Sequence, residues 1–213
     1  MTVSFKNSSK QLFNTFKINI EDLKNYKQIL TEALIVLPYK DDTVLCRQVL
    51  NTISMVNQYQ ILELSNELVK LLTLKQLRSF AIESLGFWLQ VPSFKQHAYK
   101  IFLDDPELEV KFTALLAWAS YYTASKDPEV LTKLYNILIN DNYAFPIRKT
   151  ALAGMLNVSG VRYKTSELGI LNLMHVESTK DFYHNINWNI VTNIMKTFAP
   201  EALKVYPIIN PSN

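Results

Sequence analysis

Glycine and cysteine are scarce in this sequence, and both absences restrict the fold. Four glycines occur among 213 residues, so the chain has little of the residue that tight hairpins, phosphate-binding loops and left-handed turns require. The single cysteine, Cys46, excludes a disulfide within the chain and any metal site built from several thiolates. These absences favour a helical protein and a reducing, cytoplasmic location.

Long apolar runs and a secretory signal are missing as well. A membrane span needs roughly 18 unbroken apolar residues, whereas the run ILTEALIVLPY is short and contains Glu32. The first ten residues, MTVSFKNSSK, lack the apolar core of a signal peptide. Hydrophobic residues make up 48% of the chain, which is ample for a buried core. We therefore expect one soluble domain over residues 1–213 that contacts no membrane.

Motifs of nucleotide-binding proteins and metalloproteases do not occur either. The sequence contains no G-x-x-x-x-G-K-[ST], no G-x-G-x-x-G and no H-E-x-x-H. The three histidines, His97, His175 and His184, are separated along the chain and do not make a zinc ligand set. We predict no catalytic residue, no metal site and no cofactor, and we favour a protein that is not an enzyme.

One pattern recurs along the chain: an apolar residue, then Arg or Lys, then a small or apolar residue three places later. We call the second place the register position. It is occupied by Arg47, Arg78, Lys111, Arg148 and, in a weaker match, Asn187. Successive register positions are about 31 to 39 residues apart, a spacing that suits two helices and two loops in each repeat.

The second helix of each repeat carries an apolar stripe. Places minus one, plus three, plus four and plus seven from the register position share one side of a helix, and only Asn51 and Ser54 among them are polar. Aspartates stand six or seven places before the register position and are predicted to cap these helices, namely Asp41, Asp105, Asp141 and Asp181. The stripe is the predicted core: Cys46, Leu50, Leu77, Ala81, Ile82, Leu85, Val110, Ala114, Leu115, Trp118, Ile147, Ala151, Leu152, Met155, Ile186, Ile190, Val191 and Ile194.

A first helix with its own apolar periodicity precedes each second helix. Breakers such as Pro38, Pro92 and Asp127-Pro128 mark the joints, and no linker divides the chain. A short helix and an irregular tail are predicted around Pro200, Pro207 and Pro211. The predicted first helices span residues 20–37, 58–72, 93–103, 128–140 and 165–176, and a capping helix is predicted over 8–17.

Two second-helix segments, DPELEVKFTALLAWA and DNYAFPIRKTALAGM, resemble the second-helix signature of HEAT repeats, including the variety found in phycobilin lyases. The resemblance covers most of residues 20 to 197. It implies an all-α fold, a right-handed α-solenoid of about five HEAT-like helix pairs with an N-terminal capping helix. Such solenoids serve as scaffolds, inhibitors, lyase subunits and, in one branch, DNA-alkylation glycosylases, so the resemblance implies far more about fold than about function.

The resemblance also implies that the second helices line the concave side. The exposed places are then plus one, plus two, plus five and plus nine, and only three of these twenty are charged. Such an apolar surface favours a groove that a partner protein covers; the alternative is that these side chains pack between neighbouring repeats. The predicted partner-binding residues are Phe80, Glu83, Phe87, Phe112, Leu116, Lys149 and Trp188.

Three hypotheses on function follow. The first is a cytoplasmic protein-interaction module, such as a scaffold, an inhibitor or an immunity-type protein. The second is a DNA binder of the alkyl-purine DNA glycosylase type, which the pI near 8.8 favours. It is disfavoured because Lys149 and Lys196 are the only basic residues at the exposed places and Glu83 is the only carboxylate there. The third is a lyase-like subunit that holds an apolar ligand.

The register cations are predicted to form a ladder between repeats, and Trp88 and Trp118 to pack in the interior.

Overall fold

The structure is a computed structural model, and it describes residues 20–39, 44, 46, 48–49, 52–53, 62–161 and 186–206. No strand occurs among these residues, which confirms the all-α class. The predicted capping helix over 8–17 and the predicted first helix over 165–176 lie outside the described residues. The chain divides into two compact units, Met1–Phe94 and Lys95–Asn213, so the single-domain prediction stays a prediction.

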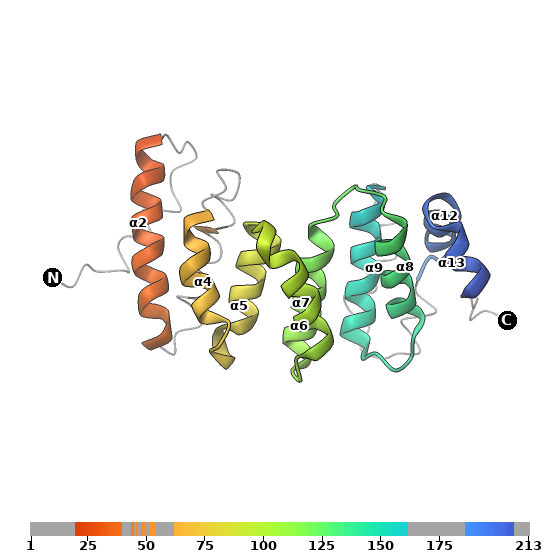
Figure 1. Ribbon diagram of the computed structural model, residues 1–213, viewed down its shortest axis with the longest axis horizontal. Helices are drawn as coiled ribbons and strands as arrows, with labels where there is room; N and C mark the ends of the chain where they lie inside the picture. Colours follow the sequence, from red (N-terminus) through yellow and green to blue (C-terminus); the bar gives the residue numbers. More distant parts are fainter. Residues whose placement is uncertain are drawn as a thin grey trace. The chain divides into compact units, whose positions relative to one another are not determined.

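The first described element of the first unit is helix α2 (Ile20–Val36), which ends in the 3-10 turn η1 (Leu37–Tyr39) (Figure 1). A 3-10 turn, η3 (Leu62–Leu64), leads into α4 (Ser65–Leu71). Helix α2 packs against α4. The two helices carry leucines and an alanine that are almost fully buried: Leu30, Ala33, Leu34, Leu68 and Leu71.

The second helix that pairs with α4 ends as a π-helix. The 3-10 turn η4 (Lys75–Leu77) precedes α5 (Arg78–Ile82), and α5 continues directly into the π-helix η5 (Glu83–Trp88). The wider hydrogen bond from Leu89 N to Ser84 O, 2.9 Å long, marks this change of winding. Both α5 and η5 pack against α4, and the short turn η6 (Pro92–Phe94) ends the unit.

The second unit is built from helix hairpins. Helix α6 (Lys95–Asp104) pairs with α7 (Leu108–Ser120), and α8 (Pro128–Ile139) pairs with α9 (Phe145–Ser159). Helix α12 (Trp188–Phe198) packs on α8 and α9, and the short helix α13 (Pro200–Val205) follows it, as predicted around Pro200.

Helices α7 and α9 lie side by side and run in the same direction (Figure 1). Their C-terminal ends are joined by hydrogen bonds from Ala124 N to Asn157 O (2.8 Å) and from Asn157 Nδ2 to Thr123 Oγ1 (2.9 Å). One turn earlier the helices approach so closely that a Cβ at Gly154 would lie 3.1 Å from the Cβ of Ala119. Second helices of successive hairpins are therefore direct neighbours in this unit.

The predicted core stripe is confirmed. Every described member from Leu77 to Ile194 is buried, whereas Cys46 is half-buried. Trp118 belongs to this core and stacks against Tyr99 of α6, with 4.5 Å between ring centroids. Leu50 lies outside the described residues. The apolar period of the second helices therefore faces the interior of each unit, as helix geometry requires.

The register cations in the described part of the chain, which excludes Arg47, bond to the C-terminal end of the first helix in their own pair. Arg78 Nε donates to Leu72 O (3.0 Å), Lys111 Nζ to Leu103 O (3.1 Å) and Arg148 Nε to Leu138 O (3.0 Å). Each acceptor is a carbonyl at the C-terminal end of a first helix, where carbonyls have no partner within the helix and a cation is favoured. These bonds join the two helices of one pair, and the ladder between repeats stays a prediction.

Two of the predicted helix caps are wrong. Helix α9 begins after Ala144, which makes no side-chain cap, and Asp141 instead accepts a 3.0 Å hydrogen bond from Arg148 Nη1. Asp105 accepts from the backbone N–H of Glu107 (2.9 Å), which is itself the residue before α7. Both aspartates stand too far ahead of the helix start to reach its first N–H groups. A true cap occurs at Asp127, whose carboxylate accepts from Glu129 N and Val130 N at the start of α8.

Candidate functional site

The predicted partner-binding surface falls on both units, and in the first unit part of it is buried. Phe80 is only 9% exposed, so its placement on an open face was wrong. It stands at place plus two of a short helix that packs against α4 and continues into η5, and the period of one helix does not fix which of its sides its neighbours cover. Thr52 and Ser120, from the same set of places, are also buried and turn their hydroxyls onto carbonyls of their own helices.

Glu83, Phe87 and Trp88 form one cluster in the π-helix. Trp88 Nε1 donates to Glu83 Oε1 at 3.1 Å, and the Phe87 and Trp88 rings meet edge to face with 4.7 Å between centroids. Burial raises the pKa of Glu83 and the indole hydrogen bond lowers it. All three side chains are half-buried. Trp88 therefore contributes a polar contact to this cluster that the sequence did not indicate, and Glu83 is engaged by its neighbour.

In the second unit the outward arc of α7 carries Glu109, Phe112, Thr113 and Leu116. Phe112 and Leu116 are half-buried and one turn apart, and Glu109 lies exposed one turn before Thr113. Leu108, 43% exposed, extends the apolar side toward the start of the helix. Spacings of three and four residues place these side chains on one side of a helix. The sequence indicated Phe112 and Leu116 but not Glu109, which precedes the register position.

Helix α9 presents Lys149, Thr150 and Ala153 beside this arc. Because Ala119 of α7 meets Gly154 of α9, residues about 35 apart lie level with one another across the two parallel helices. Lys149 is therefore level with Ala114, between Phe112 and Leu116 along α7. Its ammonium lies 6.0 Å from the ring centroid of Phe145. Three of the predicted residues therefore stand on two neighbouring parallel helices, although the described contact of Lys149 is with Phe145 of its own helix. We call their surface the α7/α9 face: Phe112, Leu116 and Lys149, with Glu109 at its edge.

Trp188 lies apart from these three. It is the first residue of α12, it is half-buried, and its helix packs on α8 and α9. The structure therefore places Trp188 on a helix that packs on α9, whereas Phe112 and Leu116 belong to α7.

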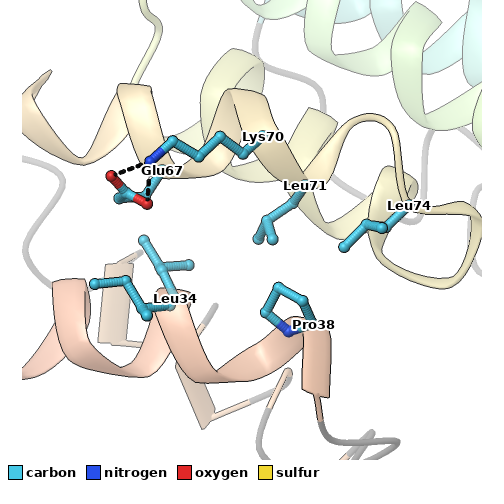
Figure 2. Close-up of a pocket in the computed structure, with 7 residues that line it drawn as sticks. Leu34, Pro38, Glu67, Lys70, Leu71 and Leu74 are labelled. Atoms are coloured by element: carbon cyan, nitrogen blue, oxygen red, sulfur yellow. Dashed lines mark hydrogen bonds and ion pairs between the residues drawn. The ribbon is translucent and has the colours of Figure 1, made fainter.

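A groove lies in the first unit between α2 and α4. Its volume is about 460 Å³. Figure 2 shows Leu34 and Pro38 on one wall facing Leu71 and Leu74 on the other, with the Glu67 and Lys70 side chains at one end. Lys70 Nζ is 2.7 and 2.9 Å from the two Glu67 carboxylate oxygens. The sequence did not indicate this groove, because its walls come from first helices and the predicted binding surface lies on second helices.

Among the described residues no three His, Cys, Asp or Glu side chains stand close enough together to hold a metal ion. In the same part of the chain no helix combines the length and the apolar character that crossing a membrane needs.

Comparison of the chain with protein-family profiles, with curated proteins and with solved structures finds no significant match. A proposal on function therefore rests on this chain's own residues.

Proposed function

We propose that the protein is a non-enzymatic interaction module, an α-solenoid of about five HEAT-like helix pairs that holds a partner protein against its second helices. The recurring spacing of the register positions supports the solenoid, as do the buried stripe and the parallel neighbours α7 and α9. The repeated bond from a register cation to its first helix supports equivalence between pairs. An array of this kind offers one continuous surface formed by successive second helices.

The observation that carries the proposal is the apolar character of the α7/α9 face. Phe112 and Leu116 retain access to solvent on the outward arc of α7, and Ala153 is exposed on α9. Clustered apolar side chains that remain accessible mark interaction sites more often than isolated ones do. An aromatic ring among them supplies the large, rigid contact that dominates binding energy at protein interfaces.

Binding of duplex DNA is less well supported. A protein that neutralises several phosphates needs several basic side chains on one surface. Among the described residues of the α7/α9 face, Lys149 is the only cation, and Glu109 opposes it. The affinity of the chain for labelled duplex should therefore be weak and should show little dependence on salt.

A charge placed inside the face tests the proposal. Phe112→Asp should abolish capture of partners from the native host, because it buries a carboxylate against the partner's apolar surface. Val205→Asp is the matched control, since Val205 is 69% exposed on α13 and lies outside the face. Both variants should retain the circular dichroism of the wild type. Equal capture by wild type and Phe112→Asp, or tight and salt-sensitive duplex binding, would refute the proposal.

A further inference from the structure

The π-helix of the first unit carries a carboxylate that no described cation pairs with. Glu83 Oε1 accepts a 3.1 Å hydrogen bond from Trp88 Nε1, and an indole is a neutral donor. The ion pairs among the described residues do not include Glu83. Its other oxygen, Oε2, accepts from no described residue and is not one of the sealed polar atoms. Glu83 is therefore a half-buried negative charge with acceptor capacity left over.

The rings of Phe87 and Trp88 present negative faces beside this carboxylate. Their planes meet at 89° with 4.7 Å between centroids, so the two rings form a corner and not a parallel stack. The face of an aromatic ring is negative, and it attracts a cation that lies within about 6 Å of the centroid. Both rings are half-buried and keep some access to solvent. The indole hydrogen bond fixes Glu83 at the edge of one ring of this corner.

In the second unit such ring faces are occupied by lysines of the chain itself. The ammonium of Lys95, for example, lies 3.6 Å from the centroid of the Tyr122 ring. In the described part of the chain no lysine or arginine lies over Phe87 or Trp88. Burial raises the pKa of Glu83 because desolvation disfavours its charge, and a cation beside the carboxylate offsets that cost. The cluster thus attracts a cation through two kinds of group, and no described residue supplies one.

We propose that Glu83, Phe87 and Trp88 form a binding site for a primary alkylammonium group, such as the end of a lysine side chain. The ammonium donates to Glu83 Oε2, and its charge and first methylene groups lie against the two ring faces. A quaternary ammonium has no N–H to donate, and a flat guanidinium suits a parallel stack better than a corner. The site belongs to the first unit and is separate from the α7/α9 face, so neither proposal depends on the other.

The indole N–H groups report binding in the full chain. Three tryptophans occur in the sequence, so a proton–nitrogen correlation spectrum contains three indole signals, and Trp88→Phe identifies that of Trp88. At constant ionic strength n-butylammonium chloride should shift this signal with a dissociation constant below about 10 mM, whereas n-butanol should not. A capped lysine that binds at least as tightly supports a protein side chain as the ligand, and weaker binding of the capped lysine supports a free amine.

Two variants assign the binding to the carboxylate and to the rings. Glu83→Gln keeps an acceptor for the indole but loses the charge, and it should weaken n-butylammonium binding at least about tenfold. Phe87→Leu removes one ring face and should weaken binding about two- to fivefold, which tests the site even if Glu83→Gln does not fold. Glu201→Gln is the matched control, because Glu201 is an exposed carboxylate of α13 that pairs with Lys204; it should bind as the wild type does.

Three results would overturn the site. The first is the absence of a saturable shift of the Trp88 signal in the wild type, and the second is an equal response to n-butanol. The third is unchanged affinity for n-butylammonium in Glu83→Gln or in Phe87→Leu, with circular dichroism showing that the variant is folded.

Discussion

Arg148 should contribute more to stability than Arg78 or Lys111, because its bond to the first helix of its pair is the most deeply buried of the three. The side chain is 1% exposed, and its Nε–H donates to Leu138 O at the end of α8. Its second bond reaches Asp141, whose side chain is 83% exposed. Burial lowers the pKa of Arg148, and Asp141 opposes that shift. The guanidinium remains charged at neutral pH, so both bonds are charge-assisted.

The magnitude follows from what each substitution removes. Arg148→Met keeps most of the apolar stem but leaves the buried Leu138 carbonyl without this donor, which costs about 1–3 kcal/mol. Arg148→Ala also removes about two buried methylene groups, each worth about 0.8 kcal/mol, so its total cost is about 3–4 kcal/mol. Asp141→Asn weakens only a contact on the solvent side and should cost less than about 1 kcal/mol.

Urea unfolding followed by circular dichroism measures these differences, provided that the slope of free energy against urea stays constant. Lys111→Met is the matched control at an equivalent position, because its bond to Leu103 O is exposed and should contribute at most about 1 kcal/mol. A cost below about 0.5 kcal/mol for Arg148→Met would refute the reasoning. An equal cost for Asp141→Asn would also refute it, since the ion pair and not the helix cap would then carry the effect.

Three further predictions concern packing, capping and pH. Gly154→Leu should destabilise the protein by about 3 kcal/mol in urea titrations, because Ala119 and Leu134 already lie 3.1 Å from a Cβ at that position; Ala153→Leu, on the exposed side of the same helix, should cost little. Asp127→Ala should lower the free energy of unfolding by about 1 kcal/mol because it removes the cap of α8, and Asp127→Asn should lower it less. Equal losses in the two variants would show that the side chain does not act as a cap. Burial raises the pKa of Glu83 above 4.5, so the wild type binds more protons when folded and should lose stability relative to Glu83→Gln as pH rises above 4.5; a pH-independent difference between the two would contradict this.

The core could be predicted from the sequence because helix geometry alone determines it. Residues at fixed offsets share one side of a helix whatever lies opposite, and the buried set from Leu77 to Ile194 follows that rule. Placing Phe80 in solvent failed because burial depends on which neighbouring elements lie against a helix, a property of several elements together. Periodicity within one helix contains no information on those neighbours.

Local departures from α-helical winding were also beyond the sequence reading. The contact between Glu83 and Trp88 spans five residues and is brought about by the π-helix, whereas pairs three or four apart are the ones an α-helix places together. The aspartate at 141 resembles a cap in sequence, yet the chain makes its turn between that residue and α9, and the carboxylate meets Arg148 instead. In both cases the outcome depends on where a helix changes its winding or begins.

Because Arg78, Lys111 and Arg148 each tie a second helix to the first helix of the same hairpin, the bond does not depend on which hairpin comes next. A gene that gained or lost one whole hairpin would leave all remaining bonds of this kind intact. The chain can therefore change its length in evolution, or by design, in steps of about 31 to 39 residues without rebuilding the ends of its helices.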